Sequence, residues 1–377
     1  MPTITYLTTI QFDFGAVKML ADEAKAVGIT RPLLVTDKGV RDCGVLDRVL
    51  EQLPDAMTVS IFDGTPENPT ENAVLDALSR YREGECDGMI AVGGGSPMDL
   101  AKGVAILAAH EPPLKQYAAI FGGAAKITNN IAPVIAVPTT AGTGSEVGRG
   151  AILTLNDGRK LGFSSPNNIP KRAICDPELT FGLSKRLTAA TGMDAVAHCV
   201  ETFISPVINP PAEGIAFEGL RRAMGHIERA VADGSDREAR WEMMMAAMMG
   251  AMSFQKGLGA VHAISHPLGG MQEPRLHHGT LNAVVMPAVL RYNASHVGDK
   301  YDRLCDAMGL DHGTNLPAFI EGFNAKLKLP SNLREMGVPE AVVPVMAAAA
   351  ELDHCNATNP RPATKDDYLI LINEAMG

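Results

Sequence analysis

Hydrophobic residues follow two different patterns along the chain, and the pattern changes near residue 180. Before that point, short runs rich in Val, Ile and Leu are bounded by turn residues, as in RPLLVTD (31–37), GMIAVGGGS (88–96) and APVIAVPTTAGTGSE (132–146). Runs of this kind are typical of buried parallel strands. Between them, NPTENAVLDALSRYREG (68–84) carries apolar residues at helical spacing. Alternation of strands and helices predicts an α/β domain with a largely parallel sheet.

Beyond residue 180 the strand pattern ends and long helical segments follow. LTAATGMDAVAHCVETFI (187–204), PAEGIAFEGLRRAMGHIERAVADG (211–234) and DREARWEMMMAAMMGAMSF (236–254) are rich in Ala, Met, Leu and Glu. Methionine fills irregular gaps readily, so the methionine stripe is interpreted as core packing. We therefore expect an α/β domain over residues 1–180, an all-helical domain over 181–377, and a functional site in the cleft between them.

Composition and charge narrow the class of protein further. Of the 377 residues, 46% are hydrophobic and 20% are charged, which is ordinary for a globular chain. No apolar run reaches the roughly eighteen residues of a membrane span, and the first residues lack the pattern of a secretory signal. The net charge of −10, without a long basic block, argues against nucleic acid as a partner. Six cysteines without a CxxC pair indicate free thiols in a reducing cytoplasm.

A glycine-rich segment follows one of the apolar runs. In GMIAVGGGSPMDLAKGVAIL (88–107) the strand ends at Val92, three glycines follow, and a helix is predicted to begin near Pro97 with Ser96 as its N-cap. Glycines at the start of a helix leave backbone amides open to an anion, and the helix dipole favours negative charge there. A plain strand-to-helix turn has the same composition, so this segment alone leaves both interpretations open.

Two further features favour a dinucleotide. PTTAGTGSE (138–146) also follows an apolar run, and the hydroxyls of Thr139, Thr140 and Thr143 could line a phosphate or a sugar. Asp37 ends an earlier run, where a carboxylate can accept hydrogen bonds from both ribose hydroxyls and repel a 2′-phosphate. Together with the glycines, these features predict NAD rather than NADP as the cofactor.

Histidine is concentrated in the helical half. HAISHPLGGMQEPRLHHG (262–279) holds four of the ten histidines, and histidine is the commonest neutral metal ligand. Asp194 and His198 lie four residues apart on a predicted helix and share one face, and His262 and His266 repeat that spacing. A carboxylate, two imidazoles and one further histidine would give a divalent cation three or four ligands. The alternatives are a surface hydrogen-bonded pair at Asp194 and His198, and a core histidine at His262.

In their order along the chain, these segments resemble the iron-containing (group III) alcohol dehydrogenases. The resemblance covers about residues 10–300 and rests on GGGSPMDLAK, PTTAGTGSE, LTAATGMDAVAHCVE, HAISHPLGG and HHGTLNAVVMP. LDHCNATNPRP (352–362) is also similar to the end of that family. The resemblance implies an N-terminal Rossmann-like NAD-binding domain, a C-terminal helical domain and a divalent metal in the cleft, Fe²⁺ first and Zn²⁺ as the alternative.

The resemblance also implies roles for single residues. The metal ligands that it implies are Asp194, His198, His262 and His278. The cofactor-binding residues that it implies are Asp37, Gly94, Gly95, Ser96, Thr139, Thr140, Thr143 and Lys160. His266 matches a histidine beside the metal that is not a ligand, and it would carry the released proton toward solvent as a catalytic residue. The interval from His262 to His278 is two residues longer than in the family, so His277 is an alternative to His278.

The longer interval bears on the substrate, because it places Arg275 and Glu273 in the loop before the fourth ligand. Arginine can pair with a substrate carboxylate in a bidentate manner, and a salt bridge to Glu273 is the alternative. Residues 257–293 are most similar to family members that act on 4-hydroxybutyrate, whose oxidised form is succinate semialdehyde. This substrate is the leading prediction, and a general primary-alcohol dehydrogenase or a lactaldehyde or diol reductase is the alternative.

Other classes of protein share parts of these patterns. Dehydroquinate synthase-like relatives use NAD and zinc without net oxidation, and a non-catalytic nucleotide sensor would need no metal. The maleylacetate reductases lack the metal ligands, so Asp194 and the histidines argue against that branch. The expected partner is a small alcohol or aldehyde, carboxylated in the leading prediction. We expect neither nucleic acid nor membrane as a partner, and a homodimer or larger homo-oligomer, which is common in the family.

Overall fold

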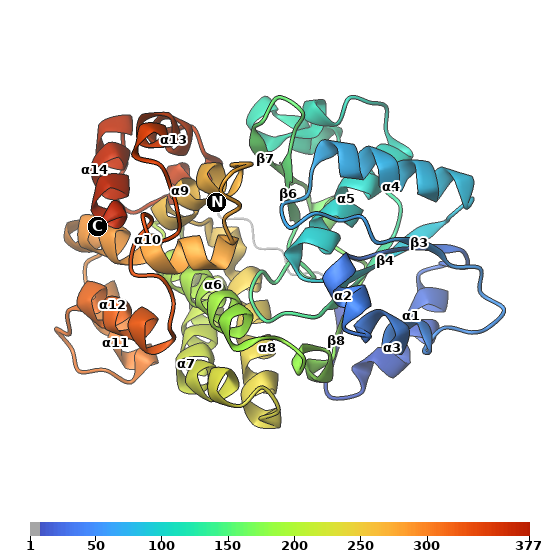
Figure 1. Ribbon diagram of the computed structural model, residues 1–377, viewed down its shortest axis with the longest axis horizontal. Helices are drawn as coiled ribbons and strands as arrows, with labels where there is room; N and C mark the ends of the chain where they lie inside the picture. Colours follow the sequence, from blue (N-terminus) through green and yellow to red (C-terminus); the bar gives the residue numbers. More distant parts are fainter. Residues whose placement is uncertain (1–7) are drawn as a thin grey trace. The chain divides into compact units, whose positions relative to one another are not determined.

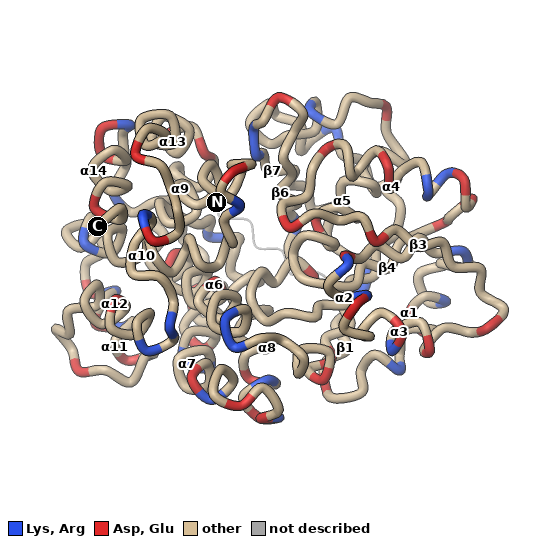
Figure 2. The backbone as a smooth tube through the Cα atoms, in the orientation of Figure 1, with Lys and Arg blue, Asp and Glu red and all other residues tan. Residues whose placement is uncertain are grey.

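The computed structural model describes residues 8–377 (Figure 1). The described chain divides into two compact units. One holds the chain up to Thr140 together with Gly144–Gly182, and the other holds Ala141–Thr143 and Leu183–Gly377. Lys and Arg are interspersed with Asp and Glu in both units (Figure 2). Within the described residues, no helix is both long enough and apolar enough to cross a bilayer.

The first unit is built on a six-stranded sheet in which all strands are parallel. The order is β1-β8-β5-β4-β2-β3. The strands are β1 (Thr9–Phe12), β2 (Pro32–Val35), β3 (Ser60–Phe62), β4 (Gly88–Gly93), β5 (Val134–Pro138) and β8 (Arg172–Cys175). The central strands β2, β4 and β5 are buried at every position, as a sheet covered on both faces requires. The predicted α/β domain with a parallel sheet is confirmed.

Helices cover both faces of this sheet, because successive strand residues point into two separate cores. Leu33 and Met89 belong to the core formed with α4 (Glu71–Glu83) and α5 (Gly95–Ala109). Leu34 and Ile90 belong to the core formed with α1 (Leu20–Ala26), α2 (Lys38–Asp42) and α3 (Val45–Leu50). Short 3₁₀ turns complete the unit at Ala16–Met19, Leu114–Tyr117, Ala119–Phe121, Gly123–Lys126, Pro166–Asn168 and Pro177–Thr180.

The turn from β4 into α5 differs from the prediction. α5 begins at Gly95 with Gly94 as its N-cap, so the predicted start near Pro97 with Ser96 as N-cap was wrong. Gly93 has φ +150°, and a Cβ at this position would lie 2.6 Å from Pro97. Glycine therefore lets the helix begin directly after the strand. Ser96 lies inside the first turn, where its hydroxyl donates a hydrogen bond to the backbone oxygen of Glu67.

An antiparallel hairpin that the sequence did not predict packs on α5. Its strands are β6 (Gly150–Thr154) and β7 (Lys160–Ser164). The fully buried Lys102 of α5 forms hydrogen bonds that hold the loop before β6 against this helix. Its Nζ donates to the backbone oxygens of Ser145 (2.7 Å), Gly148 (2.9 Å) and Gly150 (2.8 Å), and to Oγ of Ser145 (2.7 Å).

Two buried carboxyl groups, those of Asp99 and Glu146, interact electrostatically with Lys102. Oδ1 of Asp99 accepts a hydrogen bond from Ser145 Oγ (2.7 Å), and Oδ2 accepts one from the backbone N–H of Ile152 (3.0 Å). Burial lowers the pKa of Lys102 to about 8, although Asp99 opposes the shift. Burial also raises the pKa of Glu146 to about 7, and its Oε2 has no hydrogen-bond partner among the described residues. This glutamate is therefore a source of pH-dependent stability.

The second unit is helical, and no strand follows Cys175 in the described chain. Its helices are α6 (Lys185–Ile204), α7 (Pro210–Ala232), α8 (Arg237–Met252), α9 (Ala260–Gly269), α10 (His278–Asn293), α11 (Lys300–Met308), α12 (Leu316–Lys326), α13 (Val343–Glu351) and α14 (Lys365–Met376). 3₁₀ turns lie at Ser253–Lys256, Ala294–His296, Glu340–Val342 and His354–Thr358. Met243, Met244 and Met248 are buried, which confirms that the methionine stripe packs in the core.

A side-chain cap fixes the start of α6, and one glycine lets α10 approach this helix closely. Ser184 caps α6 by accepting a hydrogen bond from the backbone N–H of Leu187. In the first turn of α10, Gly279 lies so close to α6 that a Cβ would be 2.3 Å from the backbone oxygen of Ala190 and 3.2 Å from Cβ of Asp194. The missing side chain therefore lets the start of α10 reach the middle of α6.

We expect Gly279→Ala to destabilise the helical unit, because the new methyl group would collide with backbone. Overpacking of this kind costs about 1–3 kcal/mol, which lowers a thermal midpoint by several degrees. Gly225→Ala is the matched control: Gly225 lies exposed in α7 with open space where a Cβ would be added, so alanine should stabilise by about 0.5–1 kcal/mol. Equal midpoints for both variants, measured by calorimetry, would contradict the close approach.

We expect Glu146→Gln to stabilise the protein at pH 8 and to have little effect at pH 4.5. The pKa of Glu146 is raised from 4.5 to about 7, so the folded chain binds more protons than the unfolded chain between these values. Stability contributed by this carboxyl is therefore lost as pH rises through that window, by up to about 3 kcal/mol. Thermal midpoints of both proteins across pH 4.5–8 test this, and a pH-independent difference would speak against it.

Candidate functional site

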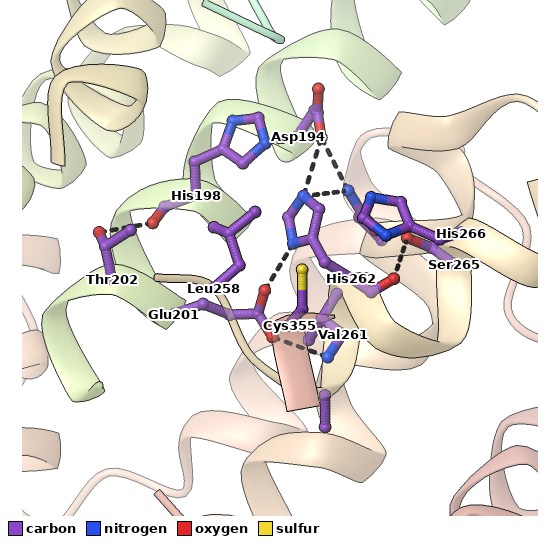
Figure 3. Close-up of polar contacts among 12 residues, drawn as sticks. Asp194, His198, Glu201, Thr202, Leu258, Val261, His262, Ser265, His266 and Cys355 are labelled. Carbon is purple, nitrogen blue, oxygen red and sulfur yellow. Dashed lines mark hydrogen bonds and ion pairs between the residues drawn. The ribbon is translucent and has the colours of Figure 1, made fainter. Parts of the chain in front are cut away.

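Three helices bring one carboxylate and three imidazoles together in the helical unit; Figure 3 labels Asp194, His198 and His262 of this group. Asp194 and His198 lie one turn apart on α6, as their spacing predicted. His262 lies on α9 and His278 is the first residue of α10. Asp194, His198 and His262 are buried, whereas the side chain of His278 is 27% exposed. The alternative of a surface pair at Asp194 and His198 is therefore excluded.

The nitrogen and oxygen atoms of this cluster are spaced as ligands of one ion are. Oδ1 of Asp194 lies 3.6 Å from Nε2 of His198, 3.9 Å from Nε2 of His262 and 3.7 Å from Nε2 of His278. All four atoms lie within 4.8 Å of one another. Four atoms about 2.1 Å from a cation at tetrahedral corners are about 3.4 Å apart. The observed separations are slightly longer, so the residues fit a divalent cation.

Burial also sets the protonation state that metal binding requires. It lowers the pKa of His198 to about 4 and that of His262 to about 3, although the neighbouring Asp194 opposes both shifts. Both rings are therefore neutral at neutral pH, and each keeps a nitrogen lone pair available for a ligand bond. A neutral imidazole is the form that binds a metal ion.

Two further polar side chains surround the four atoms. Glu201, one turn after His198 on α6, places Oε2 2.5 Å from Nδ1 of His262. Asn282 on α10 donates from Nδ2 to Oδ1 of Asp194 (2.7 Å), and the same nitrogen lies 3.2 Å from Nε2 of His262 and 3.3 Å from Nε2 of His278. Both residues are buried, so they help to hold the cluster in place.

A second cluster adjoins the first and contains His266. Nδ1 of His266 donates to Oδ2 of Asp353 (2.9 Å), and Nδ1 of His354 lies 3.5 Å from the other oxygen of Asp353. The ring of His266 stacks on His278 on one side and on His354 on the other. Although burial acts in the opposite direction, the imidazoles hold the pKa of Asp353 well below its usual range. Asp353 is therefore an ionised acceptor between a buried and a half-exposed histidine.

His277 and His278 have different positions, although they are adjacent. Nδ1 of His277 accepts a hydrogen bond from the backbone N–H of Thr280 (3.3 Å), so this residue caps α10. His278 instead contributes Nε2 to the cluster with Asp194. In the loop before them, Arg275 is exposed, and no ion pair joins it to Glu273 within residues 8–377. The salt bridge considered from the sequence is thus not formed.

In the α/β unit, three of the predicted nucleotide-binding segments leave neighbouring strands at the same edge of the sheet. Asp37 follows β2, the glycines follow β4, and Thr139 and Thr140 follow β5. Because these strands are parallel neighbours in the sheet, their carboxyl ends lie together, which is where open α/β sheets bind ligands. The backbone N–H of Thr139 donates to the oxygen of Gly93 (2.9 Å), which joins two of the loops.

The remaining cofactor candidates differ in their surroundings. Gly94, Gly95 and Ser96 are partly exposed around the start of α5. Asp37 caps α2, because its Oδ1 accepts a hydrogen bond from the backbone N–H of Val40 (3.0 Å). Lys160, at the start of β7, donates to Oδ1 of Asn68 (2.8 Å). Thr143 groups with the helical unit rather than with Thr139 and Thr140.

Sequence reasoning missed Glu201, Asn282 and Asp353. Glu201 lies seven residues after Asp194, on the same helical face, so helical spacing could have indicated it. Asn282 follows His278 by four residues, which gives the same kind of signal. Asp353 contacts a histidine 87 residues earlier, and no local pattern indicates that contact.

Comparison with known proteins covers both units. Residues 8–177 match the model of the iron-containing alcohol dehydrogenases, and residues 188–376 match that of the C-terminal domain of the same family. The chain is 56% identical to a 4-hydroxybutyrate dehydrogenase of Cupriavidus necator, with all of both chains covered. It is 38% identical to a 1,3-propanediol dehydrogenase of Klebsiella pneumoniae, over 97% of this chain and 96% of the relative.

A solved structure agrees with these sequence matches. The crystal structure of a 1,3-propanediol oxidoreductase superposes with a TM-score of 0.92 at 37% identity, covering 99% of this chain and 100% of the other. The activity class expected from the sequence, an NAD-linked alcohol dehydrogenase with a metal cofactor, is confirmed by these relationships. Since family models match both units and full-length relatives share more than a third of its residues, the chain belongs to the iron-containing alcohol dehydrogenase family.

Proposed function

We propose that this chain catalyses the reversible NAD-linked oxidation of 4-hydroxybutyrate to succinate semialdehyde. The main support for the proposal is that a carboxylate oxygen of Asp194 and three imidazole nitrogens lie together in a chain of this family, and that Asp194 is buried. The choice of substrate is supported by the relative from Cupriavidus necator, which is named for that substrate and is 56% identical over its whole length. A 1,3-propanediol dehydrogenase at 38% identity supports a general primary-alcohol or diol dehydrogenase as the second candidate.

The proposed ligands of the metal are Asp194, His198, His262 and His278. One carboxylate oxygen and three imidazole nitrogens accept both Fe²⁺ and Zn²⁺, and the family's description favours iron. A divalent cation supplies Lewis acidity, which makes loss of the hydroxyl proton of the substrate easier. Of the four proposed ligands, only His278 has a side chain that is not buried (27% exposed).

His266 is the proposed acceptor of the hydroxyl proton. Because Nδ1 of His266 donates to Asp353, Nε2 is the nitrogen with a free lone pair. A proton taken up at Nε2 makes the ring an imidazolium, which the carboxylate of Asp353 stabilises as the corresponding aspartate does in a catalytic triad. His354, whose side chain is half exposed, stacks on His266 and has Nδ1 3.5 Å from the other oxygen of Asp353.

The loops at the edge of the parallel sheet are the proposed NAD site. The backbone amides of Gly94, Gly95 and Ser96 would bind the pyrophosphate at the start of α5. Asp37 would bind the ribose hydroxyls, and the hydroxyls of Thr139, Thr140 and Thr143 together with Lys160 would complete the site. NAD would accept the hydride that leaves the carbinol carbon of the substrate.

Arg275 is the proposed partner of the substrate carboxylate. It is exposed, and no ion pair occupies its guanidinium in the described structure, so it remains available for a carboxylate. The same proposal places the enzyme in the cytoplasm, which its six free cysteines support. Assembly into a homodimer or larger homo-oligomer is inferred from the family resemblance.

His262→Ala is expected to remove bound metal and to lower kcat by about 10³-fold or more, because several kcal/mol of Lewis-acid stabilisation are lost. Binding of NADH, measured by its fluorescence, should be unchanged, since all of the proposed NAD-binding residues except Thr143 lie in the other unit. His312→Ala is the matched control, because His312 is exposed and pairs with Asp306 outside the cluster. Activity retained by metal-free His262→Ala would refute the proposal.

Arg275→Gln is expected to raise KM for 4-hydroxybutyrate by about 10- to 100-fold, since a charge-assisted hydrogen bond is worth about 1.5–3 kcal/mol. KM for 1-butanol, which has no carboxylate, should stay the same. Glu273→Gln on the same loop is the control and should not raise either KM. If the parent enzyme turns over both substrates with equal efficiency, the second candidate function replaces the first.

A further inference from the structure

Glu201 is a buried carboxylate whose two oxygens have different partners (Figure 3). Oε1 accepts a hydrogen bond from the backbone N–H of Val261 (2.7 Å), which caps the start of α9. Oε2 lies 2.5 Å from Nδ1 of His262. Gly259 leaves room for this carboxylate, because a Cβ at that position would lie 3.0 Å from Oε1. The same side chain thus holds both the backbone of α9 and the imidazole of its first histidine.

No lysine or arginine pairs with Glu201 in the described part of the chain; its side-chain partner is the neutral imidazole of His262. A buried carboxylate without a cation costs free energy, and an apolar side chain would fill the same volume more cheaply. The contact with His262 therefore explains why a carboxylate is useful at this position.

The contact decides which nitrogen of His262 carries the hydrogen. The ionised form of Glu201 can only accept hydrogen bonds, so with this form Nδ1 of His262 must donate and carries the hydrogen. Nε2 then keeps its lone pair, and it is Nε2 that faces Oδ1 of Asp194 (3.9 Å) and Nδ2 of Asn282 (3.2 Å). The opposite tautomer would place a hydrogen on Nε2 and block the proposed ligand bond.

We propose that Glu201 is a positioning residue that selects the metal-binding tautomer of His262 and so sets the affinity of the site for its cation. This inference rests on the proposed function. Glu201 is not one of the four proposed ligands, and it acts through His262. Carboxylates that orient a ligating histidine in this way typically contribute 10- to 100-fold to metal affinity.

Glu201→Gln tests the proposal, because glutamine has nearly the same shape but one acceptor and one donor. If its oxygen continues to cap Val261, its –NH₂ group faces Nδ1 of His262 and favours the tautomer with hydrogen on Nε2. We expect about 10- to 100-fold weaker binding of Zn²⁺, measured by competition with a chromophoric chelator on the full-length chain. The thermal midpoint without metal should change little.

Asp353→Asn is the matched control. Asp353 makes the same kind of carboxylate contact, at 2.9 Å, but with His266, which is not a proposed ligand. The Asp353→Asn substitution also removes one negative charge close to the cluster. This variant therefore measures the purely electrostatic effect on Zn²⁺ affinity. We expect this variant to bind Zn²⁺ within about threefold of the parent. Equal weakening in both variants would overturn the proposal in favour of charge alone.

A second measurement reads the tautomer in the parent protein and does not need the Glu201→Gln variant. Imidazole ¹⁵N–¹H spectra of the metal-free parent should show the Nδ1–H form of His262, assigned by its loss in His262→Gln. An Nε2–H form in the parent would overturn the tautomer assignment. If the parent binds one Zn²⁺ per chain and Glu201→Gln binds it equally well, this inference fails while the proposed metal centre stands. If the parent binds no Zn²⁺, both fail.

Discussion

The helical unit depends on one constraint: a carboxylate and three imidazole lone pairs share a small buried volume. Oδ1 of Asp194 lies within 3.6–3.9 Å of three imidazole nitrogens, and burial keeps at least two of those rings neutral. Four acceptors that face one another repel, and removal of the carboxylate from water adds several kcal/mol to the cost. Such an arrangement is stable only when a donor or a cation lies among the acceptors. The amide of Asn282 is one such donor, and a divalent cation satisfies all four atoms.

The surroundings of the cluster follow from that constraint. Helices α6 and α10 must approach closely for Asp194 and His278 to meet, and Gly279 provides the space. Glu201 then joins α6 to α9 through His262, and Asp353 joins His266 to the segment before α14. Each of these contacts links segments that are far apart in the chain, so the three helices of the cluster are also held together by the polar residues that surround it.

In the α/β unit, buried side chains restrain the glycine-rich loops that follow the strands. Loops that bind a nucleotide through backbone amides have few side chains to anchor them, and glycine increases their freedom. Lys102 compensates, because one buried ammonium group binds three backbone oxygens and a hydroxyl of the loop and hairpin that follow β5. Asp99 holds the same hydroxyl from the other side. The helix that begins with the glycines thus also anchors the segment that follows Thr139 and Thr140, the proposed second nucleotide loop.

Local patterns in the sequence were sufficient to predict the parallel sheet, the helical second half, the buried methionines and the pairing of Asp194 with His198. Periodicity and capping act over a few residues, so they can be recognised without the tertiary structure. Membership of the family was also readable, since short motifs carry it. Tertiary structure alone decided that α5 begins at Gly95, that β6 and β7 form a hairpin, and that His278 rather than His277 faces Asp194. It also decided which carboxylates hold His262 and His266. These features depend on contacts between residues up to 87 positions apart, and on close approaches that only packing between helices fixes.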